Sequence, residues 1–521
     1  MNLENKKTLN QSKNAEDIYP DFGTETSEQT AARNAKNFKF SNNRGIAAIE
    51  KYFKFDTLGA TMKKELWGGL ATFLSLVYIL SLNPTILSGS ESVVNPEETM
   101  SYFGIFLATA IASGIASIVM GLFANVPIAV STSMGMNAMF TFNIANQGVG
   151  NQGIGYEGAL IVVLISSIIF TIISITPLRS VIIKAMPKGL MIAFAIGIGF
   201  FITYVGLANM GWYQSNGSIP IAALASFKTN FIPILLGMGC LGIILTLHFK
   251  KVPGAVAIGI LVMAIIAVIL ANTLPNSHAL VSGEGALANS NFRLEGNGWS
   301  YNFKGFSTNL ENTWSQFANA KIWTNPITYV SIFVFVIMNF FDATGTIAAM
   351  SNQLNRYTNQ HHEIPHKALV IDSGATVVGA LLGTSPVNSY VESGAGIQQG
   401  ARTGLAAILN GILFFVAIAL FPIFKAIPVC VSGAACVYIG MMMISELKDV
   451  EWKKPEFALS TFLVIIFMIT TYSIAEGIAI GIISYVFVMA VTKRAREVGL
   501  VMWTLAVLFI IYWIALAFMQ V

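Results

Sequence analysis

The stretch 383–405, GTSPVNSYVESGAGIQQGARTGL, is small and polar, although long apolar segments lie on both sides of it. Pro386 interrupts a continuous helix, and the five glycines of the stretch allow close approach of backbones. In the hydrocarbon core of a membrane, irregular backbone is tolerated only where it is buried in protein or lines a cavity. An ionisable residue at that depth is a functional candidate by default, so Glu392 is the first residue that we single out.

The composition indicates a polytopic membrane protein. Of the 521 residues, 55% are hydrophobic and 11% are charged, whereas soluble domains carry about 25% charged residues. Many of the apolar runs are about 20 residues long, which is enough to cross a bilayer. We expect no cleaved signal peptide, because the first 60 residues are polar. We expect no nucleic-acid partner, because basic and acidic residues are interspersed in that tail.

Fourteen apolar segments are predicted to span the membrane, so the fold class is an all-α polytopic membrane protein. In chain order they are 66–87, 102–125, 127–147, 157–177, 188–209, 231–248, 253–273, 326–350, 367–384, 385–400, 403–424, 427–445, 457–473 and 475–492. A further apolar run, 500–519, either spans the membrane or lies along its surface.

The segments predict five regions. These are a polar cytoplasmic tail (1–60), a first repeat of seven spans (61–273), an extracytoplasmic loop (274–325), a second repeat of seven spans (326–492) and a C-terminal apolar segment (493–521). Within the tail we expect no fixed structure over 1–40 and a short amphipathic helix within 44–64. The 274–325 loop has no sustained hydrophobic period.

Lysine and arginine in the short loops predict the orientation. If Lys63 and Lys64 are cytoplasmic, alternation places Lys250, Arg402 and Arg494 on the same side. The N-terminus is then cytoplasmic and the 274–325 loop is outside. We expect the cell (inner) membrane as the location.

An odd number of spans in each half means that repeated halves have opposite orientations. Ile198 and Gly199 match Ile439 and Gly440 at one offset, and 257–260 matches 479–482 in the same order. Inverted repeats are typical of secondary transporters, whose substrate sites lie at mid-membrane between interrupted helices.

The third and tenth spans are the interrupted ones. In the third, a short extended piece at 126–130 is expected before a half-helix that contains Gly135 and Asn137. In the tenth, 386–389 is expected to be extended and 390–399 helical. Half-helices whose N-termini meet would present free N–H groups to carbonyl oxygens or anions. Close helix packing is the alternative explanation for one such cluster, but two at matching positions favour a site.

Asp342 is a second buried acid, near the middle of the eighth span. No lysine or arginine lies in the middle of any predicted span, and a carboxyl buried without a cation favours its protonated form. Such a carboxyl suits proton-coupled transport, and a carboxylate suits a ligand with N–H donors. Asp372, near the start of the ninth span, is expected to pair with Lys367. We expect no metal site and no ATPase, because cysteines are absent from the histidine-bearing loop 361–366 and no phosphate-binding loop follows Gly379.

The chain resembles the AzgA-like branch of the nucleobase–cation symporter-2 family, the nucleobase–ascorbate transporters being cousins. The resemblance covers about 64–491. It rests on YILSLNP at 78–84, MGMNA at 134–138, FD at 341–342 with GT at 345–346, GTS at 383–385, SYVES at 389–393 and RTGL at 402–405.

This resemblance implies two inverted repeats of seven spans, a core domain that carries the site and a gate domain that moves against it. It implies uptake of purine bases such as hypoxanthine, guanine or adenine by proton symport, by a homodimer in the lipid bilayer, with no cofactor. Asp342 and Glu392 are assigned to substrate and proton coupling. The remaining expected substrate contacts are Gly135, Asn137, Phe140, Thr346, Asn388, Ser389 and Tyr390, with Asn339 and Ser133 as further candidates.

Three departures from the family pattern lie near the expected site. Asn339 stands where the family usually has a second Asp, and 131–133 replaces the usual Ala-Pro-Gly. Pro386-Val387-Asn388 stands where relatives have a run of Thr.

Other functions remain as alternatives. An anion transporter or exchanger of the sulfate-permease type would share the fold, but an acidic site with no base fits an anion poorly. A membrane enzyme would need a nucleophile–base pair or a metal cluster, and the sequence shows neither pattern. We therefore expect no enzyme activity. A channel would not require a carboxyl between broken helices.

Overall fold

We describe a computed structural model of the chain. The structure describes residues 27–88, 101–146, 153–176, 187–214, 223–224, 227–250, 252, 254–273, 303–358, 366–471 and 474–519. Predictions for 1–26, 274–302 and the loop 359–365, including His361 and His362, fall outside these residues.

The first half of the chain holds the elements that follow the N-terminal helices α2 (Ser27–Asn37), α3 (Arg44–Tyr52) and α4 (Phe55–Leu58). They are α5 (Met62–Leu76), α6 (Ile79–Leu87), α7 (Tyr102–Val119), η1 (Met120–Ala124), β1 (Val130–Thr132), α8 (Met134–Ala138), η2 (Met139–Asn146), α9 (Gly155–Ile175), α11 (Lys188–Asn209), β2 (Tyr213–Gln214), β3 (Ala223–Leu224), α12 (Phe227–Phe249) and α13 (Ala255–Thr273).

The second half follows α15 (Phe303–Ser315), η4 (Gln316–Ala318) and α16 (Ala320–Thr324). Its elements are α17 (Pro326–Thr358), α18 (His366–Leu381), β4 (Val387–Ser389), α19 (Ser393–Gln398), α20 (Gly404–Ile418), α21 (Phe421–Lys425), α22 (Val429–Ile444), η5 (Ser445–Asp449), α23 (Pro455–Thr470) and α24 (Ile474–Val491). The chain continues through η6 (Ala495–Glu497) to α25 (Leu500–Met519).

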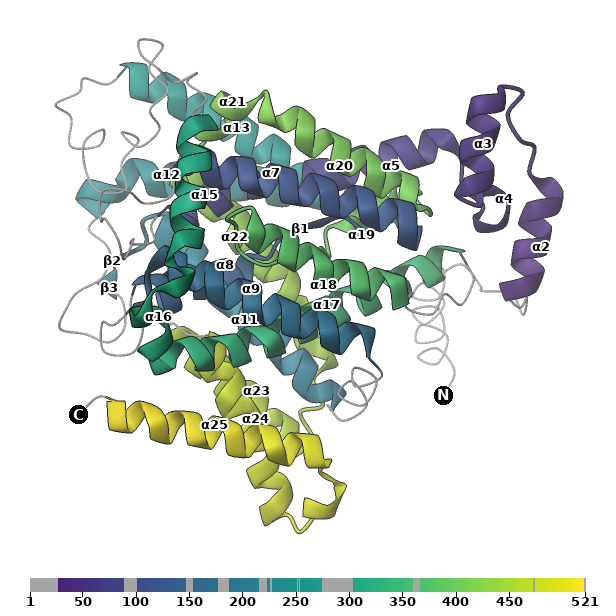
Figure 1. Ribbon diagram of the computed structural model, residues 1–521. Helices are drawn as coiled ribbons and strands as arrows, with labels where there is room; N and C mark the ends of the chain where they lie inside the picture. The colour runs from purple at the N-terminus through teal and green to yellow at the C-terminus, as the bar shows by residue number, and fades with distance from the viewer. Residues whose placement is uncertain are drawn as a thin grey trace, which may run out of the picture.

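The apolar segments predicted from the sequence are the helices of the structure. Within the described residues, six helical segments are long and apolar enough to cross a membrane. The predicted third and tenth spans are divided, because the 130–132 stretch and Pro386 interrupt helical geometry. Figure 1 shows the helices running side by side as a bundle.

The predicted breaks in the third and tenth spans are confirmed. β1 pairs with β4 in an antiparallel two-stranded sheet, with Val130 opposite Ser389 and Thr132 opposite Val387. In the third span the strand begins at Val130, later than the predicted extended piece at 126–130. The pairing satisfies backbone groups that a broken helix leaves free, which is required in a buried non-helical segment.

The two halves pack in a two-fold related pattern. α7 packs on α20 as α18 packs on α9, and α5 packs on α20 as α17 packs on α9. α11 and α22 lie against each other, with α12 on α22 matching α23 on α11. Gly199 and Gly440, which the sequence paired by repeat offset, meet here: a Cβ on Gly440 would lie 2.5 Å from the Gly199 carbonyl oxygen.

We call α5–α9 with α17–α21 the core and α11–α13 with α22–α24 the gate. The two meet where the Ser81 hydroxyl of α6 lies 3.4 Å from the Ser432 hydroxyl of α22. They also meet at Gly135 of α8, where an added Cβ would lie 3.3 Å from Ile198 and 3.6 Å from Ile474.

Two expectations about the less apolar regions were wrong. Residues 27–37, expected to lack fixed structure, form α2, which packs on α4. Residues 303–315, expected to lack a period, form α15, and Phe303 packs edge-to-face on Phe103 with ring centroids 5.2 Å apart. The expected amphipathic helix within 44–64 divides into α3, α4 and the start of α5. Packing against other helices stabilises these helices although their local sequence pattern is weak.

Candidate functional site

The site is built around the β1–β4 sheet, which joins the starts of α8 and α19. Beyond the strands, the Ser133 amide donates to the Pro386 carbonyl at 2.8 Å and the Tyr390 amide donates to the Ala129 carbonyl at 3.0 Å. The Tyr390 hydroxyl donates to the Thr132 carbonyl. These bonds hold the two interrupted spans in one register, so side chains that follow the strands have fixed positions.

Asp342 of α17 faces this sheet. One of its carboxylate oxygens, Oδ2, accepts a hydrogen bond from the Ser133 hydroxyl at 3.0 Å and another from the Asn388 side-chain amide at 3.0 Å. The three residues come from the eighth, third and tenth spans. The structure therefore brings together Asp342, Ser133 and Asn388, as the sequence predicted.

Asn388 is fully buried and connects Asp342 to its surroundings. Its side-chain Nδ2 also lies 3.3 Å from the Asn339 carbonyl oxygen Oδ1, and its own Oδ1 accepts from the Thr376 hydroxyl at 3.1 Å. Asn339 is one turn before Asp342 on α17, and its buried Nδ2 has no hydrogen-bond partner among the described residues. Two positions at which the sequence departs from the family pattern, 339 and 388, thus contact each other.

Glu392 lies just before α19, and its carboxylate oxygen Oε1 accepts a hydrogen bond of 3.1 Å from the Tyr78 hydroxyl. Tyr78 lies in the two-residue interval between α5 and α6 and is 1% exposed. The carboxyls of Glu392 and Asp342 are near enough to interact electrostatically. The structure therefore places both predicted acids in one partly buried polar region.

Sequence reasoning missed Tyr78 as a site residue. It belongs to the YILSLNP stretch that carried the family resemblance, so a signal was present. A buried hydroxyl in the middle of the first span was the clue, because such a group requires a polar partner.

Ser389 and Asp372 form a separate contact beside the sheet. The Ser389 amide and hydroxyl both donate to the Asp372 oxygen Oδ1, at 2.5 Å each. Asp372 of α18 is fully buried, and its Oδ1 fixes β4 through these two bonds. The expected pairing with Lys367 stays a prediction. Ser389 was expected to contact the substrate, but its hydroxyl donates its hydrogen to Asp372 within the protein.

Asn137 belongs to a second polar network, between α6, α7 and the turn before β4. Ser385 donates to the side-chain oxygens of Asn137 and, at 3.4 Å, of Asn83. Asn83 Nδ2 in turn donates to Thr109 at 2.7 Å and to Thr384 at 2.9 Å. These hydrogen bonds hold the turn before β4 against the first two spans.

The remaining predicted residues surround these two networks. Phe140 is buried and packs edge-on against Tyr156, whose hydroxyl donates to the Gly383 carbonyl at 2.5 Å. Thr346 is buried one turn after Asp342 on α17. Gly135 lies at the core–gate contact described above.

The C-terminal end of the 383–405 stretch is also fixed by charged groups. The Arg402 guanidinium donates to the Ile397 and Ala401 carbonyls at 2.6 and 2.7 Å, at the C-terminal end of α19. The buried Glu65 carboxylate of α5 accepts from the Arg402 and Thr403 amides at the start of α20. A cation at a helix C-terminus and an anion at an N-terminus are both favourable.

Comparison with known families identifies the class of protein. Residues 63–480 match the model of the xanthine/uracil permeases, described as a permease family. The chain belongs to this family. The resemblance predicted from the sequence is thereby confirmed, and this permease is a transporter and not an enzyme.

Curated relatives of the permease cover nearly its whole length. It is 36% identical over 472 residues to the guanine/hypoxanthine permease PbuG of Bacillus subtilis, covering 90% of this chain and 100% of PbuG. It is 32% identical to the guanine/hypoxanthine permease PbuO of the same organism (87% and 97% covered). It is 30% identical to the adenine permease AdeP of Escherichia coli (90% and 96% covered).

Solved structures confirm the fold of the permease. The transmembrane domain of the cyanobacterial bicarbonate transporter BicA aligns with a TM-score of 0.55 at 18% identity, covering 80% of this chain and 97% of that domain. SLC26A9 aligns with a TM-score of 0.51 at 11% identity, covering 90% and 72%. These transporters share the fold of two seven-span repeats, as predicted from the segment count. At such identities the likeness concerns the fold alone.

Proposed function

We propose that this permease takes up purine nucleobases by proton symport, with guanine, hypoxanthine or adenine as substrate. The relatives named above, which match it over most of its length, are guanine/hypoxanthine and adenine permeases. Proton coupling is our inference from the two acids. Among the described residues, no ion pair includes Glu392 or Asp342; the two carboxyls contact the neutral donors Tyr78, Ser133 and Asn388.

The single observation that carries the proposal is the placement of Glu392 and Asp342 in one partly buried polar region at the β1–β4 sheet. A carboxylate accepts hydrogen bonds from N–H groups, which purine bases display on their edges. A carboxyl buried without a cation also binds and releases protons readily. Glu392 then accepts N–H groups of the base, while Asp342 accepts a second group or carries the proton.

The other assigned contacts follow from their positions. Asn388 and Ser133 orient Asp342, and Tyr390 and Ser389 fix the backbone beside Glu392. Phe140, Thr346, Gly135, Asn137 and Asn339 complete the predicted substrate region around them. Alternating access then moves the gate against the core at the Ser81–Ser432 contact.

Several broader features belong to the same proposal. The halves comprise 61–273 and 326–492, the tail 1–60 is cytoplasmic, and 274–325 is extracytoplasmic. The protein works as a homodimer in the cell membrane, with protons as the coupling ion.

Uptake into permease-deficient cells tests the proposal. Cells that express the chain are expected to accumulate labelled hypoxanthine, guanine or adenine saturably, and accumulation is expected to fall when a protonophore collapses the proton gradient. Glu392→Gln is expected to reduce uptake at least a hundredfold. Glu451→Gln is the matched control, because Glu451 is half-exposed and forms a surface ion pair with Lys454.

Two results would contradict the proposal. If Glu392→Gln left proton-dependent uptake unchanged, the site assignment would be wrong. If the cells instead took up labelled sulfate or bicarbonate and none of the three bases, the anion-transporter alternative would replace it.

A further inference from the structure

Tyr78 has a fixed position in the middle of the first span. Its backbone is helical (φ −59°, ψ −25°), and the Leu82 amide donates to its carbonyl at 2.9 Å across the interval between α5 and α6. Its side chain is 1% exposed. Its hydroxyl donates to the Glu392 carboxylate, so a fixed phenol can act on that acid.

The Tyr78 hydroxyl can serve both forms of the Glu392 carboxyl. An ionised carboxylate only accepts hydrogen bonds, and the phenol donates to it as seen here at 3.1 Å. A protonated carboxyl can donate instead, and the phenol oxygen can accept. Among the described residues, no other side-chain donor to the Glu392 carboxyl is seen, so the phenol is well placed to set which form prevails.

The surroundings of this pair contain acids and phenols. The titratable groups that interact with Tyr78 or Glu392 are Asp342 of α17, Tyr390 beside β4, and Cys436 and Tyr438 of α22. None of these is a cation at neutral pH, so the Tyr78 hydroxyl supplies a stabilising contact to the ionised carboxylate.

Tyr78 also lies one turn before the core–gate contact. Ser81, three residues on, faces Ser432 of α22, and its carbonyl accepts from the Tyr102 hydroxyl at 3.2 Å. The same short segment therefore carries both the partner of Glu392 and a contact that changes when the gate moves.

We propose that Tyr78 is the positioning residue for Glu392, holding its carboxylate as the acceptor for an N–H group of the bound base. This inference rests on the proposed function. It adds a residue of the first span to a site otherwise built from the third, eighth and tenth.

Binding of labelled guanine, hypoxanthine and adenine to the purified full-length protein across pH 5–9 tests this role. Tyr78→Phe removes one hydrogen bond to a charged group, so binding at neutral pH is expected to weaken roughly tenfold. The pH below which binding is half lost is expected to move up by about one unit, because the carboxylate loses its donor. Tyr102→Phe is the matched control, since it removes a buried phenol hydroxyl that contacts the Ser81 carbonyl.

The outcomes separate the two claims. If the wild type binds a base and Tyr78→Phe has the same pH profile as Tyr102→Phe, Tyr78 has no positioning role. If the wild type binds none of the three bases, the proposed function itself is overturned, and this inference with it.

A second, independent inference concerns α25, the run that the sequence left open. Its buried residues recur on one face, at Met502, Ala506 and Phe509, and Val498 just before the helix is also buried. Phe509 packs on Phe333 of α17 with ring centroids 5.6 Å apart. α25 thus lies against the core as well as against α24 of the gate.

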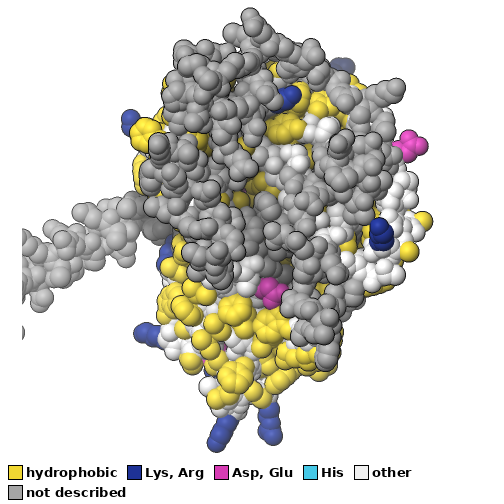
Figure 2. All heavy atoms as spheres, turned by 90° about the vertical axis from the view of Figure 1, so that its left-hand side faces the viewer, with side chains coloured by type: hydrophobic (Ala, Val, Ile, Leu, Met, Phe, Trp, Pro, Cys, Tyr) yellow, Lys and Arg dark blue, Asp and Glu magenta, His cyan; other side chains and the backbone are white. Residues whose placement is uncertain are grey.

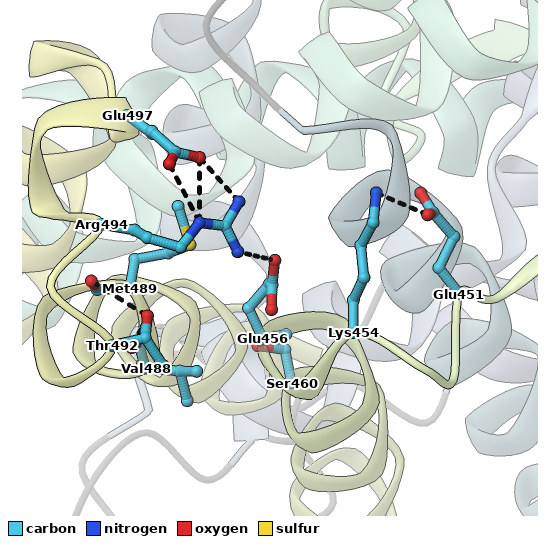
Figure 3. A network of polar contacts seen from close by, with 9 residues as sticks. All are labelled: Glu451, Lys454, Glu456, Ser460, Val488, Met489, Thr492, Arg494 and Glu497. Carbon is cyan, nitrogen blue, oxygen red and sulfur yellow. Dashed lines mark hydrogen bonds and ion pairs between the residues drawn. The ribbon is translucent and has the colours of Figure 1, made fainter.

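Polar contacts anchor α25 near both of its ends. Before it, the Arg494 guanidinium lies between Glu456 and Glu497, at 2.7 and 2.6 Å (Figure 3). These bonds raise the pKa of Arg494 and lower that of Glu497, so both remain ionised. Toward its other end, the Trp513 indole N–H donates to the Glu476 carboxylate at 2.5 Å.

The outward face of α25 is apolar. Leu500, Val507, Ile511 and Ile514 are each at least half exposed, and no charged residue occurs between 500 and 519. Figure 2 shows apolar side chains over the lower part of the molecule, where Figure 1 places α23–α25. A helix that lies on a membrane surface needs a polar face, which α25 lacks. Its 20 residues extend about 30 Å, the thickness of the hydrocarbon core.

We infer that α25 crosses the membrane as a fifteenth span, so that its end and the N-terminal helices lie on opposite faces. In Figure 1 the end of α25 lies on the left, whereas α2–α4 lie on the right. Lysine and arginine at 493–496 precede it, which places its start on the cytoplasmic side.

Cysteine labelling of the full chain in intact cells tests this topology. The buried native residues Cys240, Cys430 and Cys436 are first replaced by alanine, and Gln520→Cys or Ser12→Cys is then introduced. A membrane-impermeant maleimide is expected to label Gln520→Cys in intact cells and Ser12→Cys only after permeabilisation. Labelling of both sites under the same condition would overturn the inference.

Discussion

At the scale of single residues, the amide of Asn388 connects the acid of the eighth span to the ninth and tenth. Its Nδ2 contacts Asp342 and Asn339, and its Oδ1 accepts from Thr376. An amide can do this because it has donors and an acceptor on one planar group. A carboxylate at the same position would offer acceptors only, and Asp342 would lose one of its two donors.

We expect Asn388→Ala to weaken nucleobase binding at least tenfold, because Asp342 loses one of its two donors. It is also expected to destabilise the protein by about 1–3 kcal/mol, since Asn339 and Thr376 lose a buried partner. Binding affinity and the unfolding temperature of the purified protein measure the two effects. Thr376→Val is the control: it removes the Thr376–Asn388 bond and leaves the Asp342 contact. Equal losses of affinity in both variants would contradict this explanation.

The sequence predicted the acids of the site better than their partners. Glu392 and Asp342 were identifiable because ionisable residues in apolar spans are rare. Tyr78 was not, since its contact with Glu392 joins residues 314 apart in the chain. Nor did spacing show that Ser389 contacts Asp372, because the strand β4 that aligns them forms only with β1.

At the scale of elements, close helix contacts depend on a few glycines. η1 and α20 approach so closely that a Cβ on Gly404 would overlap the Gly121 carbonyl. α5 and α19 meet in the same way at Gly68 and Gly396. The sequence predicted where the helices lie, because long apolar runs are a strong pattern. It did not predict which glycines meet, because that depends on how the halves dock.

We expect Gly404→Ala to destabilise the permease by roughly 1–3 kcal/mol, as overpacking a buried contact does. Gly374→Ala is the matched control, because it adds the same methyl group in α18, where nothing lies within 4 Å. The control is expected to be neutral or slightly stabilising, since alanine favours helix more than glycine does. Thermal unfolding in detergent compares the two, and similar losses in both would contradict the packing argument.

The junction between α23, α24 and α25 offers a second element-scale prediction. Glu456 is buried and relies on Arg494, which is 43% exposed in its side chain. Arg494→Met is expected to lower the unfolding temperature by a few degrees, because it leaves a buried acid without its cation. Glu451→Gln breaks an exposed ion pair with Lys454 and is expected to change the unfolding temperature little. An unchanged unfolding temperature in Arg494→Met would show that the Arg494 network does not stabilise this junction.

At the scale of the whole molecule, the proposed alternating access requires the gate to move against the core. The Ser81 and Ser432 hydroxyls, 3.4 Å apart, belong to opposite sides of that boundary. We expect oxidation of a Ser81→Cys/Ser432→Cys pair, in a background without native cysteines, to stop uptake, and reductant to restore it. Either single variant should transport normally under oxidant. Continued uptake with a complete cross-link would mean that this contact does not change during transport.

The β1–β4 pairing has a consequence for biogenesis. Residues 130–132 enter the membrane when the first half is synthesised, but their partners at 387–389 follow more than 250 residues later. Until then the unpaired strand carries exposed N–H and C=O groups, which hydrocarbon cannot satisfy. The first half therefore cannot reach its final structure alone. Residues 130–132 have to stay outside the hydrocarbon, or be shielded from it, until the second half of the chain has been synthesised.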